Sequence, residues 1–192
     1  MHTTEDRLSQ QVTDDMLAAA VAATRVLSLD GSSVRLRDAW GGRTVVHVFV
    51  RQFGCLFCHE MVASLIELAP RVVARKGHVV VVGSGSVEQA ARFATAKGLP
   101  REGVSLFTDP GRESFERAGL ARTWTGTFLE KDARRAFVRA REEGFKITGV
   151  AGDVPQLGGA MVVKPPARLA YLHRSRFAGD HPDLEAVLAA VG

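Results

Sequence analysis

The chain has 192 residues, of which 46% are hydrophobic and 24% charged, which is ordinary for a soluble globular domain with a sizeable core. Its net charge is only +4 and its basic residues form no stripe interleaved with aromatic residues, so we expect no nucleic-acid partner. No apolar run reaches the length of a membrane span and the N-terminus lacks a signal-peptide pattern, so we expect a cytoplasmic protein with no membrane partner.

Residues 1–25 are predicted to be an N-terminal helical extension. Residues 1–13 are polar, which favours a loose segment. Thr13 is a candidate N-cap for a helix over residues 14–24, because two aspartates follow it and would complement the helix dipole in the first turn.

A β-hairpin is predicted next. Two alternating segments, residues 26–29 and 33–36, flank the pair Asp30-Gly31, which is a strong hairpin signal. Residues 38–43 contain glycines and should form a loop that leads into the next strand.

The central feature of the chain is a buried strand followed by a cysteine pair. Residues 45–50 form an apolar, β-branched run of the kind found in strands buried on both faces. Apolar residues recur at helical spacing from residue 61 to residue 69, so a helix should begin at or just after Cys55. Cys55 and Cys58 therefore lie where a strand passes into a helix, three residues apart and on one face of the first turn.

This position favours thiol redox chemistry. A helix N-terminus stabilises an anion, and the thiolate is the reactive form of cysteine. Cys55 is nearer the helix start and is the predicted nucleophile, while Cys58, one turn further on, is the predicted resolving cysteine. Their spacing also suits a disulfide.

Other uses of the two cysteines remain as alternatives. They could be buried and inert, or serve as the C-x-x-C-H string of a covalently attached haem. A zinc site would need two histidines, and no second pair of residues has ligand spacing. A structural disulfide would close too short a loop to stabilise the fold much. We expect no metal and no cofactor.

The helix after Cys55 is expected to run to about Arg75 with a kink at Pro70, and to be stopped by Gly77. Ser86 and Gln89 form a capping-box pattern for a later helix. The remaining predicted elements are strands over 78–82 and 104–108, helices over 87–97, 112–118, 131–143 and 182–190, with Pro182 in the first turn of the last helix, and a hairpin of 160–163 with 168–173.

The segment Gly83-Ser84-Gly85 lacks the further residues of a dinucleotide-binding or phosphate-binding loop, so it is interpreted as a tight strand-to-helix turn. Residues 120–150 are interpreted as a helical insertion. Their mixed charges at helical spacing are typical of a solvated helix face, and a segment that covers the substrate or binds a partner is the alternative.

This order of elements predicts one α/β domain over residues 26–192. It should contain a mixed β-sheet with helices on both faces, an N-terminal hairpin and the insertion at about 120–150.

The domain resembles the thioredoxin fold in its peroxiredoxin-like form. Residues 49–58, FVRQFGCLFC, are similar to the F-x-R-x-x-G-C-x-x-C segment of peroxiredoxin-like AhpC/TSA proteins. Residues 152–159 resemble the stretch before their penultimate strand, and residues 174–182 are similar to a late segment of bacterial members. The resemblance covers about residues 26–191 and extends to relatives that reduce prostamide and prostaglandin endoperoxides.

Two departures from typical peroxiredoxins concern the peroxide pocket. In their Pro-x-x-x-Thr-x-x-Cys motif the threonine helps to hold the peroxide, whereas Val48 and Gln52 occupy the proline and threonine positions here. Their arginine before the late strand corresponds to Gly158 or Gly159. Arg51 is the candidate replacement as the cation beside the thiolate, and an arginine exposed at the end of a strand is the alternative.

The resemblance implies a thiol-dependent enzyme. In the first hypothesis Cys55 attacks a peroxide or endoperoxide, Cys58 condenses with the product, and a thioredoxin-like protein or a low-molecular-weight thiol reduces the disulfide. In the second, Cys55 attacks a protein or small-molecule disulfide. The third is a non-enzymatic redox sensor or partner-binding module, with the insertion as its interface. A homodimer is an open alternative for the assembly.

Overall fold

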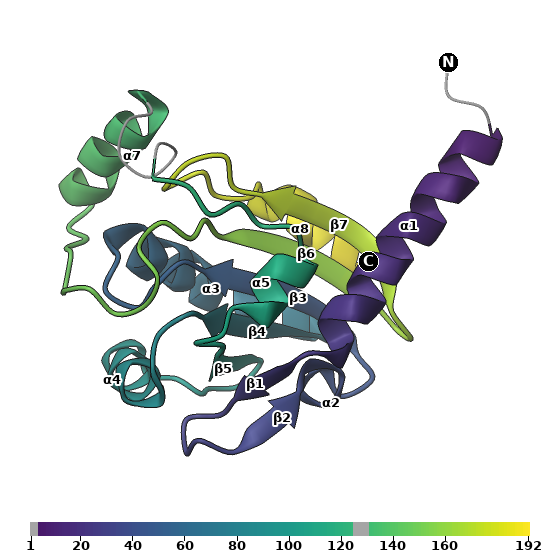
Figure 1. Cartoon of the computed structure of the whole chain (residues 1–192), viewed down its shortest axis with the longest axis horizontal. Coiled ribbons are helices and arrows are strands. Elements are labelled where there is room, and N and C mark those ends of the chain that lie inside the picture. Colours follow the sequence, from purple (N-terminus) through teal and green to yellow (C-terminus); the bar gives the residue numbers. More distant parts are fainter. Residues whose placement is uncertain (1–3, 125–130) are drawn as a thin grey trace.

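The computed structural model describes residues 4–124 and 131–192, and a mixed β-sheet lies at the centre of the molecule (Figure 1). Over the described residues the strand order is β2-β1-β5-β4-β3-β6-β7. β3 pairs in parallel with β4 and β4 in parallel with β5, while the other pairs are antiparallel. The strands are β1 (Arg25–Leu27), β2 (Ser33–Arg35), β3 (Thr44–Val50), β4 (Gly77–Gly83), β5 (Val104–Thr108), β6 (Gly159–Lys164) and β7 (Arg168–Arg174).

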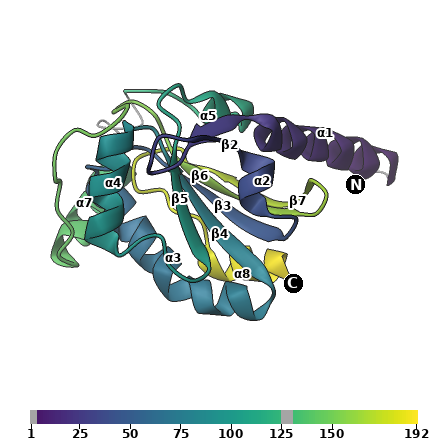
Figure 2. The ribbon, with the colours of Figure 1, turned by 90° about the horizontal axis from the view of Figure 1, so that it is seen from below.

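Helices cover both faces of this sheet (Figure 2). One face carries α3 (Leu56–Ala74), α4 (Val87–Lys97) and α8 (Leu184–Val191). The other carries α1 (Thr4–Ala23), α2 (Leu36–Trp40) and α5 (Glu113–Arg117). α7 (Lys131–Glu142) lies outside these layers and packs against α3. The predicted mixed sheet with helices on both faces is confirmed.

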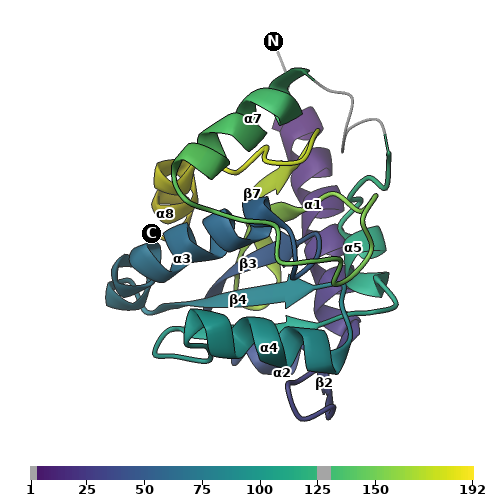
Figure 3. The same ribbon diagram turned by 90° about the vertical axis from the view of Figure 1, so that its left-hand side faces the viewer.

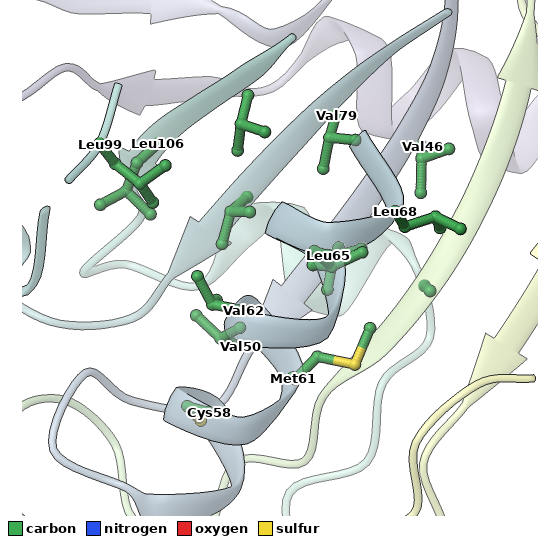
Figure 4. Packing of buried hydrophobic residues seen from close by; sticks show 14 of the residues in the cluster. Val46, Val50, Cys58, Met61, Val62, Leu65, Leu68, Val79, Leu99 and Leu106 are labelled. Atoms are coloured by element: carbon green, nitrogen blue, oxygen red, sulfur yellow. The ribbon is translucent and has the colours of Figure 1, made fainter. Parts of the chain in front are cut away.

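The two core regions follow from the alternation of side chains along β3 and β4. Val46 and Val50 of β3 point toward α3, where they meet Val62 and Leu65 in the cluster that Figure 4 shows. Residues of opposite parity, such as Phe49, point to the second cluster under α1, α2 and α5. Both faces of these strands are therefore buried, which explains their almost continuous apolar sequence.

The N-terminal segment differs from the prediction. α1 already begins at Thr4, so the expected loose segment is wrong for residues 4–13, while residues 1–3 lie outside the described part. Thr13 is inside the helix, where its hydroxyl donates to the Ser9 carbonyl at 3.0 Å, and is not an N-cap. The cause is that glutamate, glutamine and arginine are good helix formers, so a polar composition does not itself indicate a loop.

The hairpin of β1 and β2 is confirmed, but the segment after it is not the expected loop. α2 begins at Leu36, which the sequence pattern places in the second strand, and includes residues of the predicted 38–43 loop. Leu36 and Trp40 are four residues apart and both buried, so one helical turn places both side chains in the core. Gly41 ends α2 with a φ of +63°.

Two predicted helix ends also need correction. α3 runs through Pro70 as expected, but Gly77 does not stop it, because Lys76 takes the left-handed conformation and Gly77 is the first residue of β4. α8 begins at Leu184, and Asp183 is its N-cap, whose carboxylate accepts two backbone hydrogen bonds. Pro182 therefore precedes α8 and does not lie in its first turn.

The remaining predicted elements agree with the structure to within one or two residues. These are β3, β4, β5, the capping box at Ser86 and Gln89, α4, α5, α7 and the hairpin of β6 with β7. Within residues 4–124 and 131–192, no helix combines the length and apolar character that crossing a bilayer requires.

Candidate active site

The cysteine pair lies at the predicted junction between β3 and α3. Cys55 is the N-cap of α3 with extended backbone angles, and Cys58 lies in the first turn. Both side chains are buried, with 5% and 3% of their surfaces exposed, and both are free thiols. Figure 4 shows Cys58 at the end of the core cluster, to which Cys55 also belongs, so the pair is built into a packed part of the fold.

Arg51, the residue that follows β3, points at the first cysteine. Its Nη1 donates to Cys55 Sγ at 3.2 Å. Its Nε donates to the carbonyl of Gln156 at 2.8 Å and its Nη2 to that of Val154 at 2.5 Å. These carbonyls fix the plane of the guanidinium, and only 6% of Arg51 is exposed. The alternative of an exposed arginine at this position is wrong.

The surroundings of the two sulfurs separate their acidities. The pKa of Cys55 is lowered to about 6, chiefly by a hydrogen bond from the Cys58 thiol, with further contributions from the Arg51 charge and the N–H groups of Phe57 and Cys58, against the opposing effect of burial. The pKa of Cys58 is raised well above its ordinary value by burial, by its hydrogen bond to Cys55 and by the charge of Cys55. Near pH 7 the pair therefore shares one proton, held by Cys58.

The chain that returns from the insertion is bound to the loop before Cys55. Phe53 N donates to Ala151 O at 2.8 Å, and Thr148 N donates to Gly54 O at 3.0 Å. The side-chain oxygen of Gln52 accepts from Ala151 N at 2.7 Å. Gln52 thus supports the loop through its side-chain oxygen, at the position where typical peroxiredoxins have threonine.

Glycines permit this close approach. A Cβ atom on Gly54 would overlap the carbonyl of Gly149. On the other side of the loop, the ring of Phe53 occupies the space next to Gly83 and Gly85, where a Cβ atom would also overlap it. The Gly83-Ser84-Gly85 segment is therefore a turn that accommodates Phe53, in agreement with its interpretation as a tight turn.

A charged cluster around the buried Glu60, which the sequence did not reveal, joins α3 to α7. Glu60, with 6% of its surface exposed, accepts from Arg139 Nη2 at 2.8 Å and is 2.8 Å from His181 Nε2. Burial raises the pKa of Glu60, but hydrogen bonds and charges from His181 and Arg139 outweigh it and hold that pKa below its usual value. No local pattern indicates this cluster, because Glu60 and His181 are 121 residues apart in the sequence.

The insertion forms one wall of a cavity of about 540 Å³ beside Cys55. α7 lies next to α3, and the returning chain passes along the same side of the molecule (Figure 3). The residues that line this cavity are mostly apolar. They are Arg51, Gln52, Cys55, Leu56, Phe57, Ala133, Arg134, Phe137, Val138, Ile147, Gly149, Val150 and Val154.

α7 is thus more than a solvated face. Its Ala133, Ala136 and Ala140 are buried, while Arg135 and Arg139 form ion pairs and Arg134 lines the cavity. The expected helix is confirmed, and the structure gives it a second role as part of the cavity wall. The segment 125–130 of the expected insertion lies outside the described residues.

Comparisons with known proteins show the family and the fold of the chain. Residues 64–176 match the family described as AhpC/TSA antioxidant enzyme. The chain is 30% identical over 189 residues to peroxiredoxin-like 2C of Mus musculus, covering 92% of this chain and 80% of that protein. It is 26% identical over 176 residues to prostamide/prostaglandin F synthase of Salmo salar, covering 89% of this chain and 86% of that protein.

Among solved structures, peroxidoxin BcpB from Mycobacterium tuberculosis superposes with a TM-score of 0.63 at 15% identity, covering 88% of this chain and 90% of that one. This likeness shows that the chain has a peroxiredoxin fold of the thioredoxin-like class. The family match extends over more than half of the sequence, and a relative at 30% identity covers most of it. The chain therefore belongs to the AhpC/TSA antioxidant enzyme family.

Proposed function

We propose that this protein is a thiol-dependent oxidoreductase that reduces an organic peroxide through Cys55 and Cys58. The observation that carries the proposal is the state of Cys55: a thiol with a pKa lowered to about 6, held against Arg51 at 3.2 Å, on the wall of an apolar cavity. A thiol of this pKa is about nine-tenths thiolate at pH 7, compared with about 3% for a free cysteine.

In the first step the Cys55 thiolate attacks one oxygen of a hydroperoxide. A sulfur–oxygen bond forms and the oxygen–oxygen bond breaks, so Cys55 becomes a sulfenic acid and the peroxide leaves as an alkoxide, which takes up a proton to give the alcohol. Arg51 stabilises the thiolate before attack and is close enough to donate to the departing oxygen. With an endoperoxide the same attack opens the ring and leaves the substrate joined to sulfur through oxygen.

In the second step Cys58 attacks the oxidised Cys55 sulfur. The disulfide forms and the oxygen leaves as water, or as the second hydroxyl of an opened endoperoxide. Cys55 is the N-cap of α3 and Cys58 lies in its first turn, and their thiols are already hydrogen-bonded, so this step needs little movement. A thioredoxin-like protein or a low-molecular-weight thiol then restores both thiols, and no cofactor takes part.

The cavity supports an organic substrate. Hydrogen peroxide is close in size to water, which takes up about 30 Å³, whereas the cavity beside Cys55 has a volume of about 540 Å³. That volume is within the usual range for sites that bind small organic molecules. The likeness to prostamide/prostaglandin F synthase, whose name states an organic product, points in the same direction.

Disulfide exchange at the same dithiol is the second candidate. It is favoured by the use of Gln52, which bonds to the backbone at the position of the peroxide-holding threonine. It is also favoured by the exposed apolar side chains of Val138, Ile147 and Val150 at the cavity, where an extended peptide could lie. A peptide disulfide would then replace the peroxide as the target of Cys55.

Stopped-flow kinetics distinguish the candidates. The fully reduced protein is mixed with cumene hydroperoxide, with hydrogen peroxide or with an insulin disulfide, and Cys55→Ser and Cys58→Ser are measured in parallel. We expect oxidation by cumene hydroperoxide to depend on Cys55 and to exceed that of a free thiol by orders of magnitude. Peroxide oxidation no faster than that of a free thiol, with fast reduction of insulin, would replace the peroxidase function by disulfide exchange.

A further inference from the structure

One face of α7 combines apolar and cationic side chains next to the cavity. Arg134, Phe137, Val138 and Arg141 have the i, i+3, i+4, i+7 spacing that places residues on a single face of a helix. Arg134, Phe137 and Val138 line the cavity beside Cys55. The apolar pair on this face is therefore flanked by two arginines.

A second cavity continues the first one outward. Its volume is about 250 Å³, and it is lined by Leu56, Phe137, Arg141, Lys146 and Ile147. Leu56, Phe137 and Ile147 also line the first cavity, so the two are neighbours across shared side chains. Together they lead from Cys55 past an apolar wall to an outer part that carries Arg141 and Lys146.

Apart from the Cys55 thiolate, every charged side chain that lines these two cavities among the described residues is cationic. Arg51 is occupied by Cys55 and two carbonyls, whereas Arg134, Arg141 and Lys146 are exposed. The guanidinium of Arg141 lies over the Phe137 ring, 5.8 Å from its centre. Within the described part of the chain, Arg134 and Lys146 form no ion pair.

Two other arginines of α7 do form ion pairs with carboxylates. Arg135 pairs with Asp132 at 3.1 Å, and Arg139 pairs with Glu60 at 2.8 Å. The cations that face the cavities are thus the ones without a carboxylate partner in the described structure. A bound anion would supply that partner.

We propose that the cations along these walls, Arg134 in the first cavity and Arg141 and Lys146 in the second, form an extended anion subsite, which recognises the carboxylate of a single-chain amphiphilic hydroperoxide whose hydrocarbon lies along the apolar wall. The identification of the ligand as a hydroperoxide rests on the proposed function of Cys55. The anion subsite and its amphiphilic ligand rest on the two cavities and their charges.

Both the hydrocarbon chain and the carboxylate of such a ligand would contribute to its binding. Val138, Ile147 and Val150 are 55%, 62% and 72% exposed, and a hydrocarbon chain laid against them removes that apolar surface from water. The carboxylate meets cations and no acidic group along the described cavity walls. During turnover the hydroperoxide is reduced to the corresponding hydroxy acid, with water formed when Cys58 closes the disulfide.

Equilibrium binding of a ligand that is not a peroxide tests the subsite independently of the redox reaction. Dodecanoate and dodecanol are each titrated calorimetrically into three full-length proteins. The first carries Cys55→Ser alone, the second adds Arg134→Gln and Lys146→Gln, and the third adds the control Arg135→Gln to Cys55→Ser. Arg135 is one residue from Arg134 but is 81% exposed and does not line either cavity. We expect dodecanoate to bind at least about fivefold more weakly to the Arg134→Gln/Lys146→Gln protein, with dodecanol affinity and the Arg135→Gln protein little changed. Equal dodecanoate affinity in all three proteins, or no binding, would overturn the subsite.

Kinetics then test the substrate class. A long-chain fatty-acid hydroperoxide and its methyl ester are compared as oxidants of the reduced protein, and the acid should react faster than the ester. That preference should fall about fivefold in Arg134→Gln/Lys146→Gln and persist in Arg135→Gln. If dodecanoate binds as expected but neither hydroperoxide oxidises Cys55 faster than a free thiol, the proposed function fails and the anion subsite stands. Fast oxidation with no preference for the acid would overturn the subsite and leave the proposed function intact.

Discussion

Replacing Arg51 separates the contribution of its charge to the reactivity of Cys55 from that of its hydrogen bonds. Arg51→Gln removes the charge but keeps a donor, and Arg51→Lys keeps the charge on a group that cannot reproduce the contacts with Val154 and Gln156. We expect the pKa of Cys55 to rise in Arg51→Gln and to rise less in Arg51→Lys.

The magnitude follows from the geometry. An opposite charge within about 4–6 Å typically shifts a pKa by about 1–3 units, and Nη1 of Arg51 lies 3.2 Å from Cys55 Sγ. The Cys58 hydrogen bond is the larger cause and remains in the variant, so we expect a rise of about 1–2 units from the value of about 6. The thiolate fraction of Cys55 at pH 7 would fall from about nine-tenths to between about half and about one-tenth.

The assay has to measure the pH midpoint and not a single rate. A more basic thiolate is intrinsically more nucleophilic, with a Brønsted coefficient of about 0.4–0.5, so a rise of 2 units increases its nucleophilicity about 6–10-fold. That gain nearly cancels the loss of thiolate near pH 7. The rate of alkylation by iodoacetamide is therefore measured across the pH range. Cys58 stays protonated over most of this range because its pKa is raised.

Arg122→Gln is the matched control. Arg122 contacts Asp153, which belongs to the same segment as the Val154 and Gln156 carbonyls, at 2.8 Å, but it is exposed and does not touch either cysteine. An unchanged midpoint in Arg51→Gln, or an equal shift in Arg122→Gln, would refute the direct action of Arg51 on the thiolate. Thermal melting of each variant verifies that it is folded.

Three further substitutions test other parts of the account. Cys58→Ala should raise the alkylation midpoint of Cys55 by about 1–2 units, because it removes the thiol hydrogen bond, whereas Cys58→Ser keeps a donor and should shift it less. Gly54→Ala should lower the free energy of unfolding, measured by urea denaturation, by about 1–3 kcal/mol, because the new methyl group displaces the returning chain. The control is Gly111→Ala, where a Cβ atom meets only ordinary contacts, and it should change that free energy by less than about 0.5 kcal/mol. Burial lowers the pKa of His47 to about 3, below the value of about 6.5 in the unfolded chain, so the unfolded state binds more protons below about pH 6.5 and stability falls as the pH falls. Between pH 7 and pH 5 the contribution of His47 to this loss amounts to about 2 kcal/mol, so His47→Leu should lose about 2 kcal/mol less than the unsubstituted protein. Urea denaturation at both pH values measures the two losses, and equal losses would contradict the prediction.

The sequence predicted the sheet, its flanking helices and the place of the cysteines because these depend on local patterns. A strand buried on both faces has a continuous apolar sequence, and a helix has apolar residues at its own period. The junction between β3 and α3 is where these two patterns meet. The sequence therefore predicts that the helix begins at or just after Cys55, and the structure makes Cys55 its N-cap.

The supporting contacts of the site could not be predicted in this way. Arg51 is buried because two carbonyls more than 100 residues later accept its hydrogen bonds, and Glu60 is buried because His181 and Arg139 reach it from other elements. Neither arrangement leaves a periodic signal. The close approach of the returning chain depends on Gly54, where a Cβ atom would overlap the carbonyl of Gly149.

Local sequence patterns also predicted the N-terminal extension and the insertion only in part. α1 was predicted too short because its polar first half was interpreted as loose, although its residues are compatible with a helix. The helical period of α7 was visible in the sequence, but its location beside Cys55 was not. That location depends on the ion pair with Glu60 and on the backbone contacts of residues 148–152.

The most direct test of the central claim is chemical trapping of oxidised Cys55. Reduced Cys58→Ser protein is treated with one equivalent of cumene hydroperoxide in the presence of dimedone, which reacts with sulfenic acids, and the labelled position is identified by peptide mass spectrometry. The account predicts nearly complete labelling of Cys55 in Cys58→Ser and little labelling in the unsubstituted protein, where Cys58 closes the disulfide first. Absence of the adduct from Cys55, with its thiol still free after the hydroperoxide has been added, would contradict the assignment of Cys55 as the peroxide-reducing nucleophile.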